Sequence, residues 1–480
     1  MSTRVEDLFK AHVNRRLGRR ELMTTAARLG VGGMAAGFLL NRFATAALAQ
    51  GDFDWKKHSG KTVKLLLNQH PYTDAMIANI DNFRELTGME VTYDVFPEDV
   101  YFDKVTAALS SRSDQYDVFM TGAYQTWQYG PAGWLVDLRE FIEDPSKTAE
   151  SYNWEDILPG LRQSTAWSGV PGEPLGGENA KQWALPWGFE ANSVSYNRRI
   201  FDQLGITPPE NLPDMIEKAV RITEEVENVY GIGVRGSRSW ATIHPGYLSG
   251  LVNYGGGDFA VENGKLVPRM NSPEAKEFTR LWIDMIQRAG PRNWTTYTWY
   301  EVGNDLGAGA SGMIFDADIL GYFQNSGTAE AGNIGFHPFA ANPEASAPTP
   351  NVWIWSLAMN EFSREKDAGW YFMQWASGTE HTTFGATAAD LVNPVRQSVW
   401  DNSEFQERLE ESYPGYLAQY QASADGSKIY FTPQPLFFNL TTEWAASLQR
   451  MHANEVPVDE GLDMLAESVA RQLRDAGISD

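Results

Sequence analysis

Strand-like and helix-like segments alternate in the first part of the chain, and this alternation constrains the fold more than any other feature. Residues 62–68 form a short apolar run, 89–96 alternate between apolar and polar side chains, and 116–120 are again apolar, as expected for three strands. Between them, apolar residues recur at helical spacing over 76–86 and 102–109. This order predicts a parallel α/β sheet with right-handed crossovers. Ligands of such sheets bind beyond the carboxyl ends of the strands.

A second set of alternating segments follows an insertion at residues 153–182. Residues 184–197 have an extended pattern, 211–226 have the pattern of a helix that begins at an Asn and a Pro, and 312–316 form another apolar strand. The segment 351–360 then adds a further strand. A chain of 480 residues is long enough for two or three compact units, each with its own core.

Composition excludes several classes of function. The formal net charge of −23 argues against binding to nucleic acid and to anionic lipid, because both would repel the protein. The absence of cysteine excludes disulfides, thiolate nucleophiles, iron–sulfur clusters and cysteine-ligated zinc. The seven histidines show no H-x-x-x-H spacing, and no P-loop or dinucleotide fingerprint occurs in its required context. We therefore expect neither a metal nor a cofactor.

The N-terminal segment has the features of an export signal. Arg19-Arg20 precede an apolar run at 29–40, which is short of the ~20 residues that span a bilayer, and Ala47-Leu48-Ala49 fits a cleavage site. The pair of arginines resembles the bacterial twin-arginine signal, although an amphipathic N-terminal helix is the alternative. We expect residues 1–49 to be removed, so that the mature chain begins near Gln50 in the periplasm. With no cysteine to carry a lipid, we expect no membrane anchor.

Several stretches resemble one family, the extracellular solute-binding proteins of bacterial ABC importers, in its sugar-binding branch that includes maltose-binding protein. They are "TVKLLLN", "FRELTGMEVTYDVF", "YDVFMTGAYQTWQYGPAGWLVDL", "ALPWGFEANSVSYNRRIFDQLGITPPENLPDMIEKA", "GASGMIFDADILGYF", "NVWIWSLAMNEFSREKDAGWYFMQWAS" and "LVNPVRQSV". Together they cover nearly the whole mature chain. Two departures are "NLPDMIE", where relatives usually have Thr-Trp, and Asn351-Val352-Trp353, where many have Gly-Gly-Trp.

The resemblance implies a type II periplasmic-binding-protein fold, in which two α/β lobes are joined by a multi-strand hinge and ligand is trapped between them. It also implies a carbohydrate-type solute as ligand and the membrane subunits of an ABC importer as partner. We expect a monomer. The expected boundaries are residues 52–187 and 337–382 for the first lobe, 188–336 and 395–480 for the second, and hinge crossings near 186–190, 336–340 and 383–394.

A sugar site requires aromatic faces for C–H groups and polar side chains for hydroxyls. Within the implied fold, the candidates with this chemistry lie mostly at the ends of strands and at the crossings. They are Gln69, His70, Tyr124, Gln125, Trp187, His244, Asp316, Asp318, Trp353, Trp355 and Arg396.

Alternatives remain for several of these residues. His70 has the alternative of a surface loop, the two aspartates that of capping a helix, and Arg396 that of a structural ion pair. Trp353 and Trp355 are two apart on one strand and so share a face, and we favour Trp353 as the ligand contact. A glycoside hydrolase would need a carboxylate pair, for which Asp316 with Asp318 or Glu190 is the one to test. A ligand sensor for a membrane receptor would use the same fold.

Overall fold

The computed structural model describes residues 53–239 and 243–479. Residues 55–147 and 154–480 belong to one compact unit, and the described parts of that unit carry every element discussed below. Phe53, Asp54 and Thr148–Asn153 belong to a second unit, in which Glu150–Tyr152 form a 3-10 turn (η1). The predicted export signal, residues 1–49, lies outside the described residues, and so does the twin-arginine pair.

The elements of the larger unit have the following bounds. The strands are β1 (Thr62–Asn68), β2 (Glu90–Phe96), β3 (Val118–Gly122), β4 (Ala166–Trp167), β5 (Lys181–Gln182), β6 (Leu185–Asn197), β7 (Tyr230–Gly233), β8 (Phe259–Glu262), β9 (Lys265–Pro268), β10 (Ser311–Ala317), β11 (Ile334–His337) and β12 (Val352–Met359). The helices are α4 (Pro71–Thr87), α5 (Glu98–Ser110), α6 (Ala123–Tyr129), α7 (Arg139–Ile142), α8 (Pro159–Ser164), α9 (Arg198–Leu204), α10 (Leu212–Glu225), α11 (Ser249–Tyr254), α12 (Pro273–Ala289), α13 (Trp299–Ala308), α14 (Asp318–Gln324), α15 (Lys366–Ala376), α16 (Thr379–Ala388), α17 (Gln397–Trp400), α18 (Ser403–Ser412), α19 (Tyr416–Ser423), α20 (Phe437–His452) and α21 (Val458–Asp475), with short helical turns at η2 (Trp154–Asp156), η3 (His244–Leu248), η4 (Trp294–Thr296) and η5 (Ala424–Gly426).

The first three strands confirm the parallel α/β pattern expected from the sequence. β1 pairs in parallel with β2 on one side and with β3 on the other. Helix α4 begins directly after β1 because His70 caps it, its Nδ1 accepting from the Tyr72 backbone N–H at 3.3 Å, and Pro71 occupies the first turn. Gly88 ends the same helix in the left-handed conformation. The carboxyl end of β1 is thereby fixed next to a helix N-terminus.

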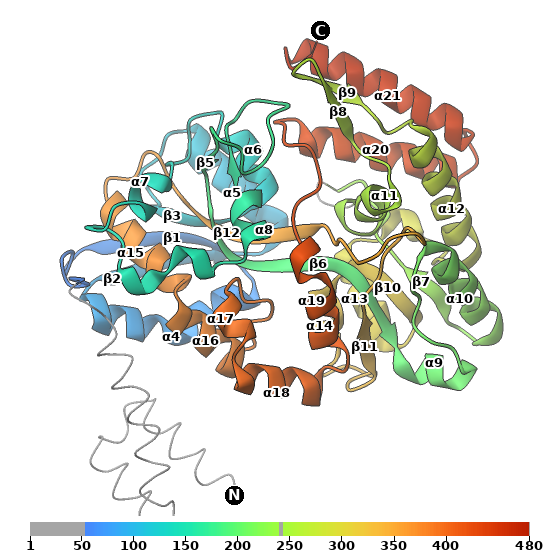
Figure 1. Cartoon of the computed structure of the whole chain (residues 1–480), viewed down its shortest axis with the longest axis horizontal. Coiled ribbons are helices and arrows are strands. Elements are labelled where there is room, and N and C mark those ends of the chain that lie inside the picture. Colours follow the sequence, from blue (N-terminus) through green and yellow to red (C-terminus); the bar gives the residue numbers. More distant parts are fainter. Residues whose placement is uncertain (1–52, 240–242, 480) are drawn as a thin grey trace, which may run out of the picture. The chain divides into compact units, whose positions relative to one another are not determined.

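The long strand β6 connects two groups of strands (Figure 1). Over Leu185–Ala191 it pairs antiparallel with β12, which pairs in turn with β3. Over Asn192–Asn197 it pairs with β10 and β11, and β7 lies parallel to β10. Among the described residues these strands form one eight-stranded sheet, in the order β2-β1-β3-β12-β6-β10-β7 with β11 attached to β6. A single strand therefore passes from one group to the other, as a hinge crossing does.

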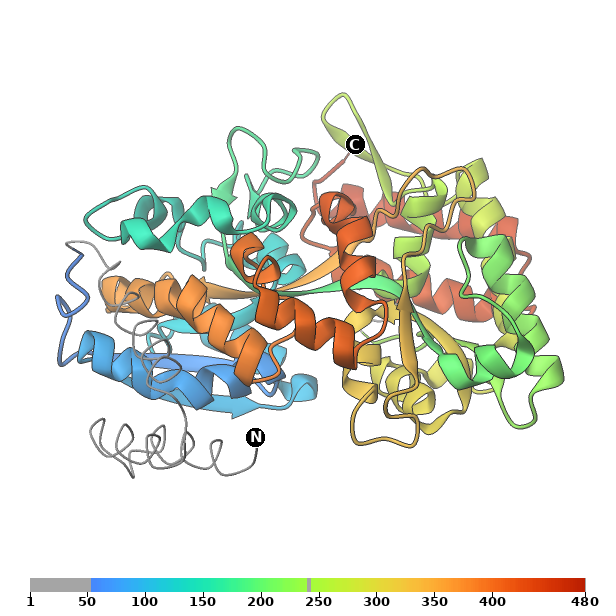
Figure 2. The ribbon, with the colours of Figure 1, turned by 60° about the horizontal axis from the view of Figure 1, so that its bottom comes forward.

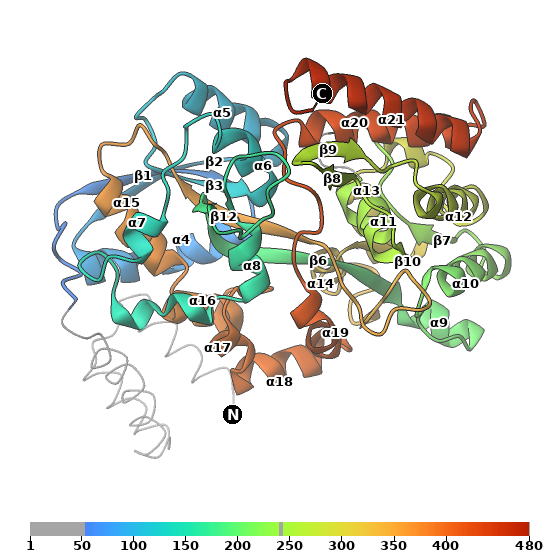
Figure 3. The same ribbon diagram turned by 45° about the horizontal axis from the view of Figure 1, so that its top comes forward.

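The helices cover both groups of strands. α4, α5 and α15 pack against β1 or its neighbours, whereas α10, α12 and α13 pack against β7 or β10. α20 and α21, the last helices of the chain, pack against α12 (Figure 3). The β8–β9 hairpin, yellow-green in Figure 2, projects beyond these helices. The lobe boundaries given above stay a prediction.

Candidate ligand-binding site

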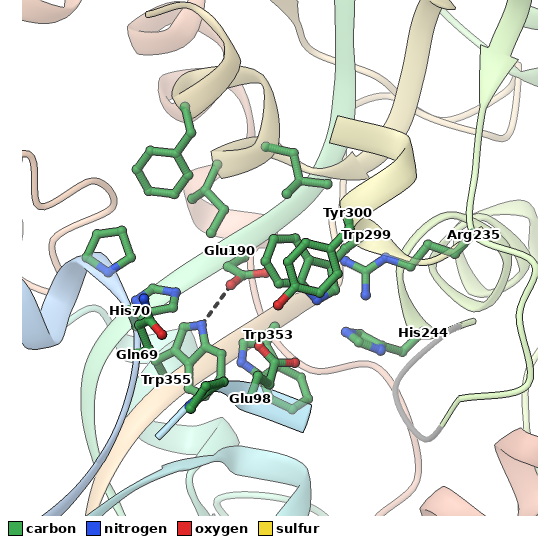
Figure 4. Close-up of a pocket in the computed structure, with 15 residues that line it drawn as sticks. Gln69, His70, Glu98, Glu190, Arg235, His244, Trp299, Tyr300, Trp353 and Trp355 are labelled. Carbon is green, nitrogen blue, oxygen red and sulfur yellow. Dashed lines mark hydrogen bonds between the residues drawn. The ribbon is translucent and has the colours of Figure 1, made fainter. Parts of the chain in front are cut away.

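A cavity of about 310 Å³ opens at the carboxyl end of β1. Its walls come from the start of α4 and α5, from β6 and β12, and from the segments around β7, η3, α13 and α14 (Figure 4). The lining residues are Gln69, His70, Pro71, Pro97, Glu98, Glu190, Arg235, His244, Trp299, Tyr300, Ile319, Leu320, Phe323, Trp353 and Trp355. Both groups of strands therefore contribute to one pocket.

Two tryptophans of β12 form an aromatic wall of the pocket. Trp353 and Trp355 lie on the same face, as the spacing predicts, with ring centroids 5.3 Å apart at 72°. His70 contacts Trp355 with its centroid 4.9 Å away. A Cβ placed on Gly122 of β3 would lie 2.3 Å from the Trp353 ring, so glycine is required there for this ring to pack. Whether either indole contacts ligand stays a prediction.

Glu190 of β6 is held against this wall by a hydrogen bond. The Nε1 of Trp355 donates to the Glu190 Oε1 at 2.7 Å, the dashed line in Figure 4. Burial raises the pKa of the Glu190 carboxyl from 4.5 to about 8, and the Trp355 bond and the Arg235 charge only partly oppose this. A carboxyl with such a pKa both accepts and donates hydrogen bonds near neutral pH, which suits a ligand hydroxyl.

Arg235 stands opposite the tryptophan wall and is anchored by Asp316. Its Nη2 donates to Asp316 Oδ1 at 2.7 Å and its Nε to Oδ2 at 2.9 Å. Asp316 is fully buried, and Arg235 is 8% exposed. The Trp294 Nε1 fixes the backbone of the same segment by donating to the Arg235 carbonyl at 3.1 Å. Asp316 therefore reaches the pocket only through this ion pair.

Helix α13 presents two aromatic side chains at the pocket. Trp299 and Tyr300 stack with centroids 3.6 Å apart at 26°, and Tyr300 is 50% exposed. A capping box sets the start of the helix, because Glu301 Oε2 accepts from the Thr298 N–H at 2.8 Å and Thr298 Oγ1 accepts from the Tyr300 N–H. Sequence reasoning missed this pair, although "TYTWYE" carries both the cap and the aromatics.

The two pocket histidines differ in their surroundings. Burial lowers the pKa of His70 to about 3, so its ring is neutral at physiological pH. Because its Nδ1 accepts from Tyr72, its Nε2 carries the proton and is a donor. His244 lies in η3 with its ring 5.1 Å from that of Trp353. His70 is therefore a fixed neutral donor at the end of β1.

Three predicted contacts lie behind the lining. Tyr124 packs under Trp353 at 5.2 Å and donates to the Val352 carbonyl at 2.9 Å. Gln125, on the same helix α6, is 3% exposed, and its amide has no hydrogen-bond partner among the residues that the structure describes. Trp187 is fully buried and donates to the Ala376 carbonyl at 3.0 Å. All three support the tryptophan wall or the core of the sheet.

Two further predicted residues hold separate segments together. Asp318, the first residue of α14, accepts from the Ala191 N–H and from Asn393 Nδ2, each at 3.0 Å. Burial raises the pKa of the Asp318 carboxyl to about 7. Arg396 is fully buried and forms the structural ion pair that was the alternative for it, with Asp156 at 3.2 Å.

Of the eleven candidates, Gln69, His70, His244, Trp353 and Trp355 line the pocket, while Tyr124, Gln125, Trp187, Asp316, Asp318 and Arg396 do not.

Pocket residues that the sequence reasoning did not select as ligand contacts are mostly charged or aromatic. Glu98 comes two residues after β2 and Arg235 two residues after β7, so the strand-end rule that selected His70 could have found both of them. Trp299 and Tyr300 begin a helix and follow no strand, and Glu190 entered only as a candidate catalytic carboxylate. Within the described part of the chain, no cluster of three metal-ligating side chains occurs. None of the helices described there has both the length and the apolarity to cross a membrane.

Comparisons with known proteins identify the family and confirm the fold. The family model for bacterial extracellular solute-binding proteins matches residues 69–383. The chain is 42% identical over 457 residues (92% of it, 94% of the relative) to an erythritol/L-threitol-binding protein of Mycolicibacterium smegmatis. It is 23% identical (80% and 86%) to a mannitol-binding protein of Pseudomonas aeruginosa. An ABC-transporter solute-binding protein from Agrobacterium vitis, solved with D-mannitol, superposes with a TM-score of 0.71 at 22% identity, covering 88% of this chain and all of that one. This chain belongs to the bacterial extracellular solute-binding proteins.

Proposed function

We propose that the protein captures a small polyol or related sugar in this pocket and delivers it to the membrane subunits of an ABC importer. The observation that carries the proposal is the combination of aromatic faces with polar groups in one cavity. Trp353, Trp355 and Tyr300 offer ring faces for C–H groups, while Glu190 and Arg235 offer partners for hydroxyls. A cavity of about 310 Å³ suits a small ligand.

The relatives support a linear polyol within this class. The protein that is 42% identical is an erythritol/L-threitol-binding protein, and a more distant relative binds mannitol. Proteins with the same fold have been solved with D-mannitol and with ribitol, the latter from Agrobacterium radiobacter at a TM-score of 0.71 and 18% identity. We therefore propose an acyclic polyol of four to six carbons as the ligand class.

Capture would proceed by closure of the two proposed lobes, residues 52–187 with 337–382 and residues 188–336 with 395–480. The pocket supports this because Gln69 and Trp355 come from one group of strands and Arg235 and Tyr300 from the other. Ligand that contacts both groups favours the closed state by its difference in affinity between the two states.

The protein binds its ligand without making or breaking a bond: Asp316 and Asp318, two of the carboxylates a hydrolase would use, hold protein groups instead.

A thermal-shift screen tests this proposal. Ligand that binds only the folded state raises its stability, by about 2.7 kcal/mol at a concentration of 100 Kd. We expect four- to six-carbon polyols to raise the melting temperature and amino acids to leave it unchanged. Trp353→Ala should abolish the shift, whereas Trp134→Ala, outside the pocket lining, should keep it. A screen in which no polyol or sugar stabilises the protein would contradict the proposal.

The proposed location is the periplasm, where the mature protein acts as an unanchored monomer. The family's extracellular placement and the N-terminal sequence support export. Removal of residues 1–49 would leave Gln50 first, and N-terminal sequencing of the exported form measures this directly. A chain that keeps Arg19-Arg20 after export would contradict it.

A further inference from the structure

Strand β6 changes its neighbouring strands at one step. Its pairing with β12 ends at Ala191, and its pairing with β10 begins at Asn192. Among the described strands, β12 alone pairs with β6 over residues 189–191. Buried backbone groups of this stretch that β12 does not bind therefore need side chains as partners. Two sets of side chains supply them, one from the helices of each group of strands.

Tyr72 of α4 supplies the first set, from the group of strands that contains β1. Its hydroxyl lies 2.9 Å from the Val392 carbonyl oxygen and 3.2 Å from that of Phe189, and shares its one proton between them. The ring packs against Gly188, where a Cβ would lie 2.1 Å from it. Tyr72 therefore ties β6 and the segment of Val392 to the first group at one point.

Asp318 of α14 and Tyr416 of α19 supply the second set, from the group that contains β10. Asp318 accepts one hydrogen bond from the Ala191 N–H and another from Asn393 Nδ2, each at 3.0 Å. The Tyr416 hydroxyl donates to Asn393 Oδ1 at 2.7 Å, and Asp318 and Tyr416 are both buried. Helix α14 packs on β10, and α19 packs on β11. These side chains therefore hold Ala191 and Asn393 to the second group.

The two sets of hydrogen bonds lie almost next to each other along the chain. In β6 the first set ends at Phe189 and the second begins at Ala191, so Glu190 is the one residue between them. In the other segment the two held residues, Val392 and Asn393, are consecutive. One bond joins the two sets, from Asn393 Nδ2 to the Phe189 carbonyl at 3.0 Å. If each set stays with its own group during closure, the backbone bends at these two places.

We propose that the lobes rotate about two points, Glu190 and the junction of Val392 with Asn393. The hydroxyls of Tyr72 and Tyr416 restrain this rotation. The inference rests on the closure contained in the proposed function, and adds where the chain bends and what limits the bending. Neither tyrosine lines the pocket, so both are positioning residues, whereas Glu190 does line it. Ligand that contacts Glu190 therefore acts at the pivot itself.

The restraint should favour binding. A protein with a loose pivot samples more arrangements of its lobes before ligand arrives, and ligand must then order them at a cost in conformational entropy. A restrained pivot has met part of that cost on folding, as in other cases of preorganisation. Loss of either hydroxyl should therefore broaden the unliganded ensemble and weaken binding, although no contact with ligand is removed.

Replacement of tyrosine by phenylalanine removes the hydroxyl and keeps the ring, and Tyr101 of α5 provides a matched control. Its buried hydroxyl also lies between two carbonyl oxygens, that of Leu66 at 2.8 Å and that of Met120 at 2.6 Å. These carbonyls belong to β1 and β3, within one group of strands. Tyr101→Phe should therefore lower the melting temperature without reaching the pivot.

Spin labels on the exposed Glu140→Cys of α7 and Glu217→Cys of α10 report the separation of the proposed lobes. Without ligand, we expect Tyr72→Phe and Tyr416→Phe each to broaden the distance distribution, and Tyr101→Phe to leave its width unchanged. Calorimetry with whichever of erythritol, threitol and mannitol binds should show a roughly two- to thirtyfold loss of affinity in the two pivot variants, as for residues that bias a conformational equilibrium without touching ligand. The control should lose none.

Either pivot variant carries the test if the other does not fold. Distance distributions as narrow as that of the control would overturn the pivot assignment, and so would affinities equal to that of the control. Polyol binding that leaves the wild-type distance unchanged would refute closure, and the pivot with it. Closure in the wild type together with control-like pivot variants removes this inference alone. Binding of a different class of solute would refute the proposed ligand, while the measurement without ligand still decides the pivot.

Discussion

Glu190 combines two roles at the scale of a single residue. Its Oε1 accepts the hydrogen bond that orients Trp355, and the charges of Arg235 and Glu98 shift the pKa of its carboxyl. Burial disfavours the ionised form, and the hydrogen bond from Trp355 only partly compensates. The same residue therefore links the aromatic wall to the charge of the cavity.

The raised pKa of Glu190 predicts a pH dependence of stability. The folded protein holds this proton more tightly than the unfolded chain. The contribution of Glu190 to the free energy of unfolding is therefore fully present below about pH 4.5 and is lost as the pH rises through about 8. Glutamine cannot ionise, so the melting temperature of Glu190→Gln minus that of the wild type should increase between pH 5 and pH 9. Asp318, whose pKa is also raised, titrates in both proteins and cancels in the difference. A difference that stays constant over this range would contradict the assignment.

At the scale of elements, local patterns predicted the scaffold well. The strand at 62–68 matches β1, 184–197 contains β6 and 351–360 contains β12, because short apolar runs between turn residues have few alternatives. The site was less predictable. Residues that directly follow β1 line the pocket, but Tyr124 after β3 lies beneath Trp353, since neighbouring strand ends differ in depth.

The missed residues share a physical reason. Arg235 and Tyr300 are far apart in sequence and are brought together by β7, β10 and α13, whose packing no local pattern reveals. Asp316 was selected for its own chemistry, whereas its structural role is to neutralise Arg235. The sequence therefore predicted types of side chain more reliably than their depth in the fold.

The capping box of α13 gives an element-scale prediction. Thr298→Ala removes the side chain that accepts from the Tyr300 N–H and should cost about 0.5–2 kcal/mol of stability. Because the cap positions Trp299 and Tyr300, ligand affinity should fall as well. Ser272→Ala removes the matching cap of α12, away from the pocket, and should cost similar stability with affinity unchanged. Denaturant unfolding and calorimetry on both variants measure this; equal affinities would show that the cap has no role in binding.

At the scale of the whole molecule, β6 joins the two groups of strands that share the pocket, because it pairs with β12 in one group and with β10 in the other. Asp318 strengthens this connection, because it links α14 to β6 through Ala191 and to the segment of Asn393. Ala191 directly follows the predicted crossing near 186–190, and Asn393 lies within the one predicted near 383–394. A ligand that contacts both groups can therefore favour one arrangement of the two groups over another.

Closure can be measured because the chain contains no cysteine. Spin labels on Asp74→Cys in α4 and Glu217→Cys in α10, both exposed, report the separation of the two groups without background labelling. We expect polyol to convert a broad distance distribution into one narrow population. The control is a pair of labels within the first proposed lobe, on Asp74→Cys and on the exposed Glu140→Cys. The distance between these two labels should not respond to ligand. A distribution unchanged by saturating ligand would contradict closure.

Binding of a small polyol in the pocket between Trp353 and Arg235 is what the proposed function requires first. Calorimetric titration of the wild type with erythritol, threitol and mannitol, repeated with Trp353→Ala, tests it most directly. We expect saturable one-to-one binding of at least one of these polyols to the wild type and a loss of at least roughly tenfold in affinity in the variant, as for a buried aromatic contact. Absence of binding by all three, or equal affinity in the variant, would contradict it.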